Sequence, residues 1–211
     1  MDVSTLIIEA FQKANLSHQT VAQTWVSVSY RVGGLLPNSL LGAAIQRDGN
    51  VDVVLRSMED ELAAPKATGP HMMHFHYQKM LSELWVGSVY ETVRLLVERK
   101  LGPADSVFRE LAHDLTMLRI PLEKHEIARD KKLTAPLQMR RLPPNNGETG
   151  IYEYSKDDST KAHIMPVGTS GRGSVMWNVI DIQANVERWL ERRDLSERLL
   201  AVWGSNHGST P

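Results

Sequence analysis

With 211 residues, the chain is long enough for one domain with a sizeable core and too short for several large ones. Its formal net charge of −1 excludes a global positive field that would attract nucleic acid, and the lack of cysteine excludes disulfides, thiolate zinc sites and a cysteine nucleophile. The N-terminal residues lack the basic region of a signal peptide, and no apolar run approaches the roughly 18 residues of a membrane span. These features predict a cytoplasmic protein with no membrane partner.

Residues 1–64 are expected to form a group of N-terminal helices. Apolar side chains recur at helical spacing from Val3 to Ala14, and the polar stretch that follows should end this first helix. Residues 18–32 fit both an alternating strand and a helical stripe. Ser17, as a cap directly before this segment, and the pair of glycines directly after it favour the helix.

A turn at Asp48-Gly49-Asn50 is expected to separate a short helix that begins at Asn38 from a helix over residues 51–62. The first 65 residues hold more acids than bases, and we interpret their carboxylates as a solvated acidic surface. These acids are Asp2, Glu9, Asp48, Asp52, Glu59, Asp60 and Glu61.

Residues 73–134 are predicted to contain a central pair of long amphipathic helices. Apolar residues recur at helical spacing over 81–100 and again over 108–126, and a Leu-Gly-Pro breaker lies between these stretches. Asp105 or Ser106 is expected to cap the second helix, because a short polar side chain there can accept a hydrogen bond from a free backbone N–H group.

The end of the second central helix has two unusual features. Pro121 should bend the helix or make it restart, because proline lacks a backbone donor and clashes with the preceding turn. The residues that follow form the most basic stretch of the chain, which predicts either a surface that contacts nucleic acid or an ordinary solvated face. The candidate nucleic-acid-binding residues are Lys124, Arg129, Lys131 and Lys132.

Residues 151–180 change character and predict a small β element, either a hairpin or three strands. Two strands are expected around a turn at residues 156–158, and a third strand is expected from Val175 to Val179. The glycine-rich stretch 168–173 leads into a strand and does not open a helix, so we interpret it as a hairpin turn and not as a phosphate-binding loop.

A final helix is predicted over residues 182–203, with Asp181 as its cap, and residues 204–211 should form a flexible tail. The arginines of this helix are expected to face outward. They are Arg188, Arg192, Arg193 and Arg198. The fold predicted for residues 1–203 is a single, mainly α domain: a helical bundle with a small C-terminal β-hairpin or three-stranded element.

Few residues of the chain indicate a familiar reaction. There is no nucleophile elbow, HExxH motif, Walker A loop or dinucleotide fingerprint. Three histidines lie close together at positions 71, 74 and 76, but only two of them would share a helix face and no nearby acid completes a ligand set. We therefore expect no metal and no cofactor. The candidate residues for a ligand-binding role of the β element are His163, Arg172 and Trp177.

Arg119 and His125 are the candidate catalytic pair. An arginine can hold a phosphate through paired hydrogen bonds at any cellular pH, and a histidine titrates near neutrality and can move a proton. Together they suffice for cleavage of RNA without a metal ion, in which the 2′-hydroxyl attacks its own phosphate. Glu91 and Arg94 are expected to support the pair, either inside the bundle or as an ordinary exposed ion pair.

The two central helices resemble the HEPN superfamily, whose members are helical bundles found in toxins, antiphage systems and RNases. The resemblance is carried by WVGSVYETVRLL on the first helix and LTMLRIPLEKHE on the second. Arg119 and His125 match the family motif of an arginine, four to six residues, and a histidine. The resemblance implies RNA binding or metal-independent RNA cleavage by a homodimer. The alternative is a non-catalytic helical protein that dimerises or binds a partner.

Overall fold

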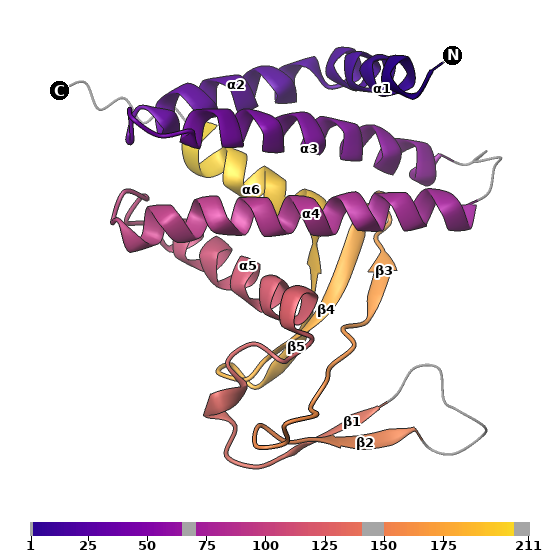
Figure 1. Cartoon of the computed structure of the whole chain (residues 1–211), viewed down its shortest axis with the longest axis vertical. Coiled ribbons are helices and arrows are strands. Elements are labelled where there is room, and N and C mark those ends of the chain that lie inside the picture. Colours follow the sequence, from indigo (N-terminus) through magenta and orange to yellow (C-terminus); the bar gives the residue numbers. More distant parts are fainter. Residues whose placement is uncertain (1, 65–70, 141–149, 205–211) are drawn as a thin grey trace.

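The protein is mainly helical with a small three-stranded β element near the C-terminus, which confirms the predicted fold class (Figure 1). The computed structural model describes residues 2–64, 71–140 and 150–204. The helices in these ranges are α1 (Val3–Ser17), α2 (Gln19–Gly33), α3 (Leu41–Ala63), α4 (His71–Glu98), α5 (Ser106–Lys124), the 3₁₀ helix η1 (Asp130–Lys132) and α6 (Arg192–Gly204). Every one of them falls short of the length or apolar character that a bilayer crossing requires.

The strands of the described ranges form two antiparallel sheets. They are β1 (Leu137–Arg140), β2 (Ile151–Tyr154), β3 (Val167–Thr169), β4 (Val175–Asp181) and β5 (Val186–Glu191). β1 and β2 make a two-stranded ribbon, whereas β3, β4 and β5 lie side by side in that order. The central strand β4 alternates between buried and half-buried residues, which confirms the predicted strand over Val175–Val179 and the glycine-rich hairpin turn before it.

Figure 1 shows α1, α2 and α3 on one side of α4, and α5 on the other side of α4. α6 packs against both α2 and α5, and β4 packs against α5, so that the hydrophobic core runs from the helices into the three-stranded sheet. The ribbon of β1 and β2 lies at the far end of the molecule from α1. The large, fully buried apolar residues include Trp85, Leu111, Leu115, Trp177 and Leu195.

α3 is one continuous helix, so the expected turn at Asp48-Gly49-Asn50 is wrong, as is the expected helix start at Asn38. Gly49 lies against the side chain of Trp25 on α2, and a Cβ atom at position 49 would be only 2.6 Å from Trp25 Cγ. The glycine therefore allows two packed helices to approach closely and does not reverse the chain.

The boundaries of the other helices agree with expectation in part. Residues 19–33 form α2, which confirms the helical interpretation of that segment. α1 continues to Ser17, so this residue does not act as a cap. Asp105 does cap α5, because its side chain accepts a hydrogen bond of 2.7 Å from the backbone N–H of Phe108. α5 passes through Pro121 without restarting and ends three residues later.

β5 lies within the segment that was expected to belong to the final helix, so this prediction is wrong for residues 186–191. The sequence VERWLE mixes charged and apolar residues in a way that fits either structure. The pairing with β4, which places the buried Leu190 opposite the buried Trp177, decides for the strand.

The expected hairpin around residues 156–158 is also wrong. β2 pairs with β1, which lies before residues 151–180 of the predicted β element, and in the described chain no strand follows the turn before β3. Residues 205–211, which make up nearly all of the expected tail, lie outside the described residues.

A buried cluster of charged side chains joins α3 to α6. Arg192, the first residue of α6, is fully buried, donates two hydrogen bonds of 2.7 and 2.8 Å to Glu59, and also bonds Asp52. Arg56 and the indole N–H of Trp25 each donate to Asp52 at 2.8 Å. Burial opposes the ionisation of Asp52, but the attraction of Arg192 and Arg56 lowers its pKa below the usual range.

The interpretation of the N-terminal carboxylates as a solvated surface is therefore wrong for Asp48, Asp52 and Glu59, all of which are buried. The outward orientation expected for Arg192 is also wrong. These residues are tolerated in the interior because a buried charge is stable only when it is paired and hydrogen-bonded.

A second, smaller cluster attaches the ribbon of β1 and β2 to the segment after α5. Ile127, Leu133 and Tyr154 are buried together. The Tyr154 hydroxyl accepts a hydrogen bond of 3.1 Å from the Ile127 N–H and donates one of 3.0 Å to Asp130, which is also paired with Lys161. Burial opposes the ionisation of Asp130, but the hydrogen bonds from Lys161 and Tyr154 lower its pKa.

The substitution Arg192→Met should lower the free energy of unfolding by about 3–5 kcal/mol, because Glu59 would stay buried without the guanidinium that donates to it and Asp52 would keep only Arg56. The matched control is Arg172→Met. Arg172 pairs with Glu191 and Glu197 at the surface, and its loss should cost about 1 kcal/mol or less. Urea unfolding followed by circular dichroism measures both variants. Equal losses would contradict the structural importance assigned to Arg192.

The substitution Asp130→Asn should show how this carboxylate responds to acid. Because the folded-state pKa of Asp130 is lowered from 3.8, its ionised form stabilises the fold above that pH, and the contribution is lost as the pH falls through the folded-state pKa. The difference in unfolding free energy between wild type and variant should therefore be constant above about pH 5 and narrow as the pH falls from about 5 to about 2. A difference that stays constant from about pH 5 to about pH 2, measured by urea titration, would contradict this account.

Candidate functional site

Arg119 lies on the side of α5 that faces α4, where two residues of α4 hold it. Its Nη2 atom is 3.8 Å from Glu91 Oε1, and its guanidinium carbon is 5.4 Å from the centre of the Tyr90 ring. Arg94 bonds the other oxygen of Glu91 at 2.8 Å and also bonds Glu98. Three of the four candidate catalytic residues, Glu91, Arg94 and Arg119, are therefore linked through one carboxylate.

Glu91 and Arg94 lie on the surface of the protein, so the expectation that they lie inside the bundle is wrong and the exposed-pair alternative holds. Their side chains are 48% and 42% exposed. The buried positions of this part of α4 belong to Val89, Val93 and Leu96, which lie on a different face of the helix. The Arg119 side chain is more enclosed, with 25% of its surface exposed.

His125 directly follows the last residue of α5 and adopts a left-handed backbone conformation with φ of 57°. Its backbone N–H donates to Pro121 at 3.1 Å, and its carbonyl accepts a bond of 2.7 Å from the His163 N–H. These two bonds fix the backbone while the residue itself is exposed. Among the described residues, no hydrogen bond or ion pair joins the His125 ring to Glu91, Arg94 or Arg119.

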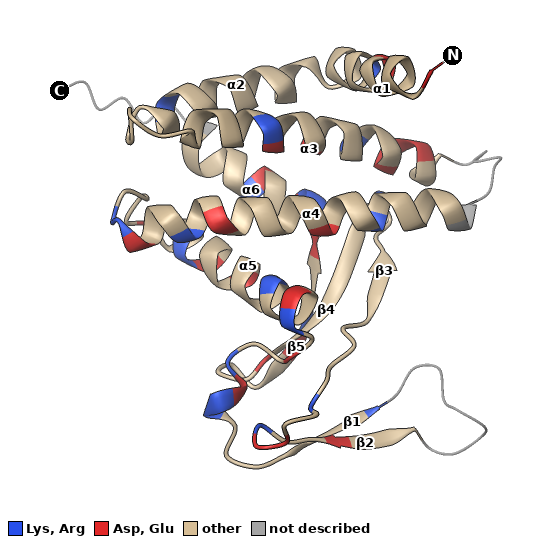
Figure 2. Ribbon diagram, in the orientation of Figure 1, with Lys and Arg blue, Asp and Glu red and all other residues tan. Residues whose placement is uncertain are grey.

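The basic residues that follow α5 lie at the surface around η1. Lys124, Arg129, Lys131 and Lys132 are all exposed. Figure 2 shows Lys and Arg together with Asp and Glu where α5 ends and in the segment after it. Arg129 donates a hydrogen bond to Gln183 in the turn between β4 and β5. This hydrogen bond holds Arg129, one of the four exposed cations, next to the turn.

The residues proposed for a ligand-binding role of the β element do not share one surface. His163 and Trp177 are buried, whereas Arg172 is exposed and bonds Glu191 and Glu197. Burial lowers the pKa of His163, so this imidazole is held in its neutral form.

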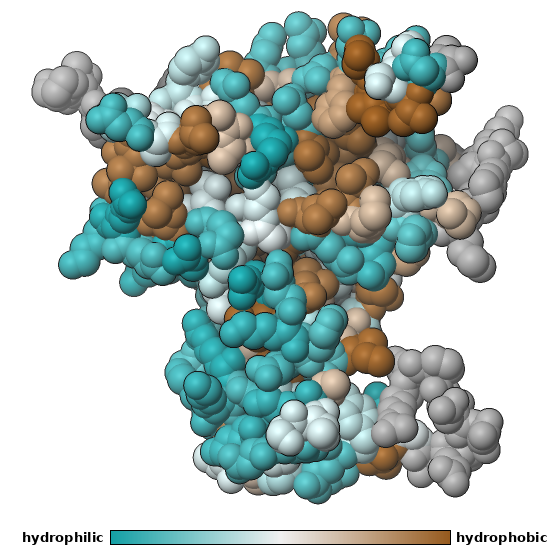
Figure 3. Space-filling model, in the orientation of Figure 1, coloured by the Kyte–Doolittle hydropathy of each residue, from teal (hydrophilic) through white to brown (hydrophobic). Residues whose placement is uncertain are grey.

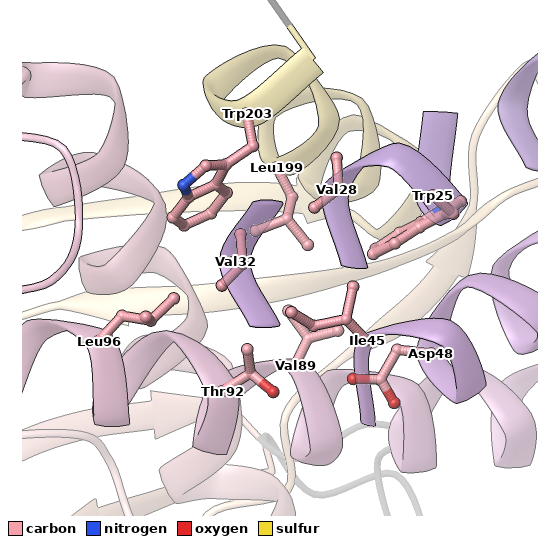
Figure 4. A pocket seen from close by; sticks show the side chains of 10 residues that line it. All are labelled: Trp25, Val28, Val32, Ile45, Asp48, Val89, Thr92, Leu96, Leu199 and Trp203. Atoms are coloured by element: carbon pink, nitrogen blue, oxygen red, sulfur yellow. The ribbon is translucent and has the colours of Figure 1, made fainter. Parts of the chain in front are cut away.

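A narrow apolar cavity lies where α2, α3, α4 and α6 meet (Figure 4). Its lining is Trp25, Val28, Val32, Ile45, Asp48, Val89, Thr92, Leu96, Leu199 and Trp203. The volume of about 10 Å³ is at the lower limit for a single water molecule. Burial raises the pKa of Asp48 at its wall, although Ser88 donates a hydrogen bond of 2.6 Å to that carboxylate. The cavity is too small for a substrate.

Asp181 is a functional candidate whose role the sequence does not reveal. The residue was expected to cap the final helix, but it ends β4 and lies 2.6 Å from the Nε2 atom of His113 on α5. The two residues are separated by 68 positions. No spacing rule connects residues so far apart, so only the packing of β4 on α5 brings this pair together.

The described residues contain no group of three or more metal-ligating side chains that could hold an ion. Of the three neighbouring histidines, His74 bonds the backbone oxygen of Met58 at 3.1 Å, and the side chain of His71 lies outside the described part of the chain. The comparisons with protein-family models, with curated proteins and with solved structures found no match for this chain.

Proposed function

We propose that the protein binds RNA and cleaves it without a metal ion, in the manner of the HEPN superfamily and in a toxin or defence role. The observation that carries the proposal is the position of Arg119, which lies half-buried between α5 and α4 beside Glu91 and Tyr90. A guanidinium held in this way supports phosphate binding, because its planar donors are already oriented. The contact with Glu91, at 3.8 Å, is long for a hydrogen bond, so donors are available to a ligand.

In the proposed reaction, the 2′-oxygen of RNA forms a bond to the adjacent phosphorus while the bond from phosphorus to the 5′-oxygen breaks. His125 accepts the proton of the 2′-hydroxyl, and Arg119 donates hydrogen bonds to the phosphate oxygens on which charge develops. A protonated imidazole returns a proton to the departing 5′-oxygen. The products are a 2′,3′-cyclic phosphate and a 5′-hydroxyl, and no water or metal ion is consumed.

Within one chain, no hydrogen bond or ion pair joins the described His125 ring to Arg119. The proposal therefore includes a homodimer, in which a second copy brings another imidazole to the guanidinium, as the family resemblance implies. Glu91 would orient Arg119, and Arg94 would hold the Glu91 carboxylate in place through its hydrogen bond of 2.8 Å.

The exposed cations after α5 support the binding of RNA. Lys124, Lys131 and Lys132 would contact backbone phosphates, which attract cations irrespective of base sequence. The binding should therefore weaken steeply as the salt concentration rises.

The cleavage hypothesis is tested by incubating the purified protein with a labelled single-stranded RNA in EDTA. His125→Ala should slow cleavage by about 10²–10⁴-fold, since it removes the proton-transfer group. Arg119→Ala should slow it by about 10²–10³-fold, since it removes a donor to the developing charge. The products should carry a 2′,3′-cyclic phosphate.

The matched controls are His76→Ala and Arg140→Ala. Both residues are exposed and belong to other parts of the molecule, at the start of α4 and on β1. These variants should cleave at the wild-type rate. If all four variants and the wild type cleave equally, the activity belongs to a contaminant and the hypothesis is wrong.

A non-catalytic interaction protein is the second candidate function, and the surface of α1 favours it. Leu6, Ile7 and Ile8 are between 51% and 56% exposed on this helix. Figure 3 shows hydrophobic residues gathered at the α1 end of the molecule, whereas the opposite end is largely hydrophilic. A contiguous apolar surface of this kind is typical of a contact between proteins, and a second copy of α1 is a suitable partner because a two-fold contact pairs the same surface with itself.

The double substitution Ile7→Glu, Ile8→Glu should abolish self-association if α1 forms the contact, because each interface would then contain four buried carboxylates. Analytical ultracentrifugation at several protein concentrations measures the change. The control is Ile164→Glu, at an exposed apolar residue outside the helices. A wild-type protein that stays monomeric, or a dimer unaffected by the double substitution, would exclude α1 as the contact.

A further inference from the structure

A second group of polar residues lines an open pocket of about 560 Å³ between α5, the hairpin of β4 and β5, and α6. This volume falls in the range of small-molecule sites, about 300–1,000 Å³. The charged and titratable residues that line it are Arg109, Glu110, His113, Asp114, Asp181, Arg188 and Arg198. None of them belongs to the proposed cleavage site.

The imidazole of His113 is held in one orientation at this pocket. Asp181 Oδ2 lies 2.6 Å from His113 Nε2, while Asp181 Oδ1 accepts the backbone N–H groups of Gln183 and Ala184 at 3.1 and 3.2 Å. Burial opposes the ionisation of Asp181, but these bonds lower its pKa, so the carboxylate accepts and Nε2 donates. The Nδ1 atom is thereby left for a ligand, and a quarter of the side chain is exposed.

Asp114 holds two of the three arginines. Its side chain is only 3% exposed, and it accepts one hydrogen bond from Arg188 and another, of 2.8 Å, from Arg198. Arg198 is paired in addition with Asp194 at 2.9 Å. Since a guanidinium has five N–H donors, both arginines keep donors that no described residue takes up. The buried carboxylate therefore fixes two guanidinium groups at the wall of the pocket.

Arg109 supplies a third guanidinium, and its charge is not neutralised locally. Its Nε donates to the backbone oxygen of Asp105 at 3.2 Å, and no carboxylate of the described residues lies within 4 Å of it. Of the carboxylates in the lining, Asp114 and Asp181 already hold cationic or imidazole partners, and Glu110 remains as an exposed acid. The formal charge of the lining is zero with a neutral His113 and becomes positive when His113 is protonated.

We propose that this pocket binds a phosphate group, with Arg109, Arg188 and Arg198 as hydrogen-bond donors and His113 as a further donor when it is protonated. Arginine suits this role because its planar fork matches two oxygens of a phosphate. The phosphate can be a free ion or the 5′-terminal phosphate of an RNA. The turn that lines the pocket through Ala184 also contacts Arg129 of the basic segment through Gln183, so an RNA terminus would have cations along its path.

Isothermal titration calorimetry with inorganic phosphate tests the site. Wild type should bind, and Arg109→Gln and His113→Gln should each weaken binding by about tenfold or more, since a hydrogen bond to a charged group contributes at least this factor. Arg140→Gln, on β1 and outside the lining of the pocket, should leave the affinity unchanged. Wild-type binding weaker than about 10 mM, or equal weakening by Arg109→Gln and Arg140→Gln, would overturn the proposal.

A second experiment shows whether the phosphate that binds is a free ion or an RNA terminus. The site binds an RNA terminus if a short RNA with a 5′-phosphate binds more tightly than both the same RNA without the 5′-phosphate and free phosphate. It binds the free ion if phosphate and the phosphorylated RNA bind with equal affinity.

Discussion

The charge of Arg192 has to be neutralised inside the core, and this constraint determines how the start of α6 packs against α3. Its partners are two carboxylates of α3 that precede it by 133 and 140 positions. Because Arg192 directly follows β5 and begins α6, the same ion pairs position a strand and a helix together. Arg188 and Arg198, which lie on either side of it in sequence, are thereby set against Asp114 on α5. The phosphate pocket is thus a consequence of how the core is neutralised.

Much of the helical architecture can be predicted from the sequence, because apolar periodicity and caps are local signals. The stripe of α2, the Asp105 cap of α5 and the alternation of β4 were all readable in this way. The continuity of α3 could not be predicted, because an Asp-Gly-Asn sequence is typical of a turn and the packing of Trp25 against Gly49 is visible only in the structure. β5 was missed because its pattern fits two structures and only its pairing with β4 decides between them.

The candidate sites were less predictable than the fold, because they depend on contacts between distant segments. The sequence singled out Arg119 and expected Glu91 to support it, but it gave no sign of the position of Arg119 beside Tyr90 or of its separation from His125. In the sequence, the charged residues of α3 resemble a solvated helix face. Their counter-charge, Arg192, lies more than 130 positions away, so no local pattern reveals the pairing. The pairing of His113 with Asp181 likewise becomes visible only when β4 is placed on α5.

The long separation between α3 and Arg192 has a consequence for how the chain folds as it is made. α3 leaves the ribosome well before Arg192 has been synthesised. Arg56 can pair with Asp52 within the same helix, but Glu59 must stay hydrated until α6 emerges. The N-terminal helices therefore cannot reach their final packing during most of translation. Closing contacts over such a distance is also slow. Until α6 has left the ribosome, the apolar surfaces of α2 and α5 that it covers stay exposed to solvent.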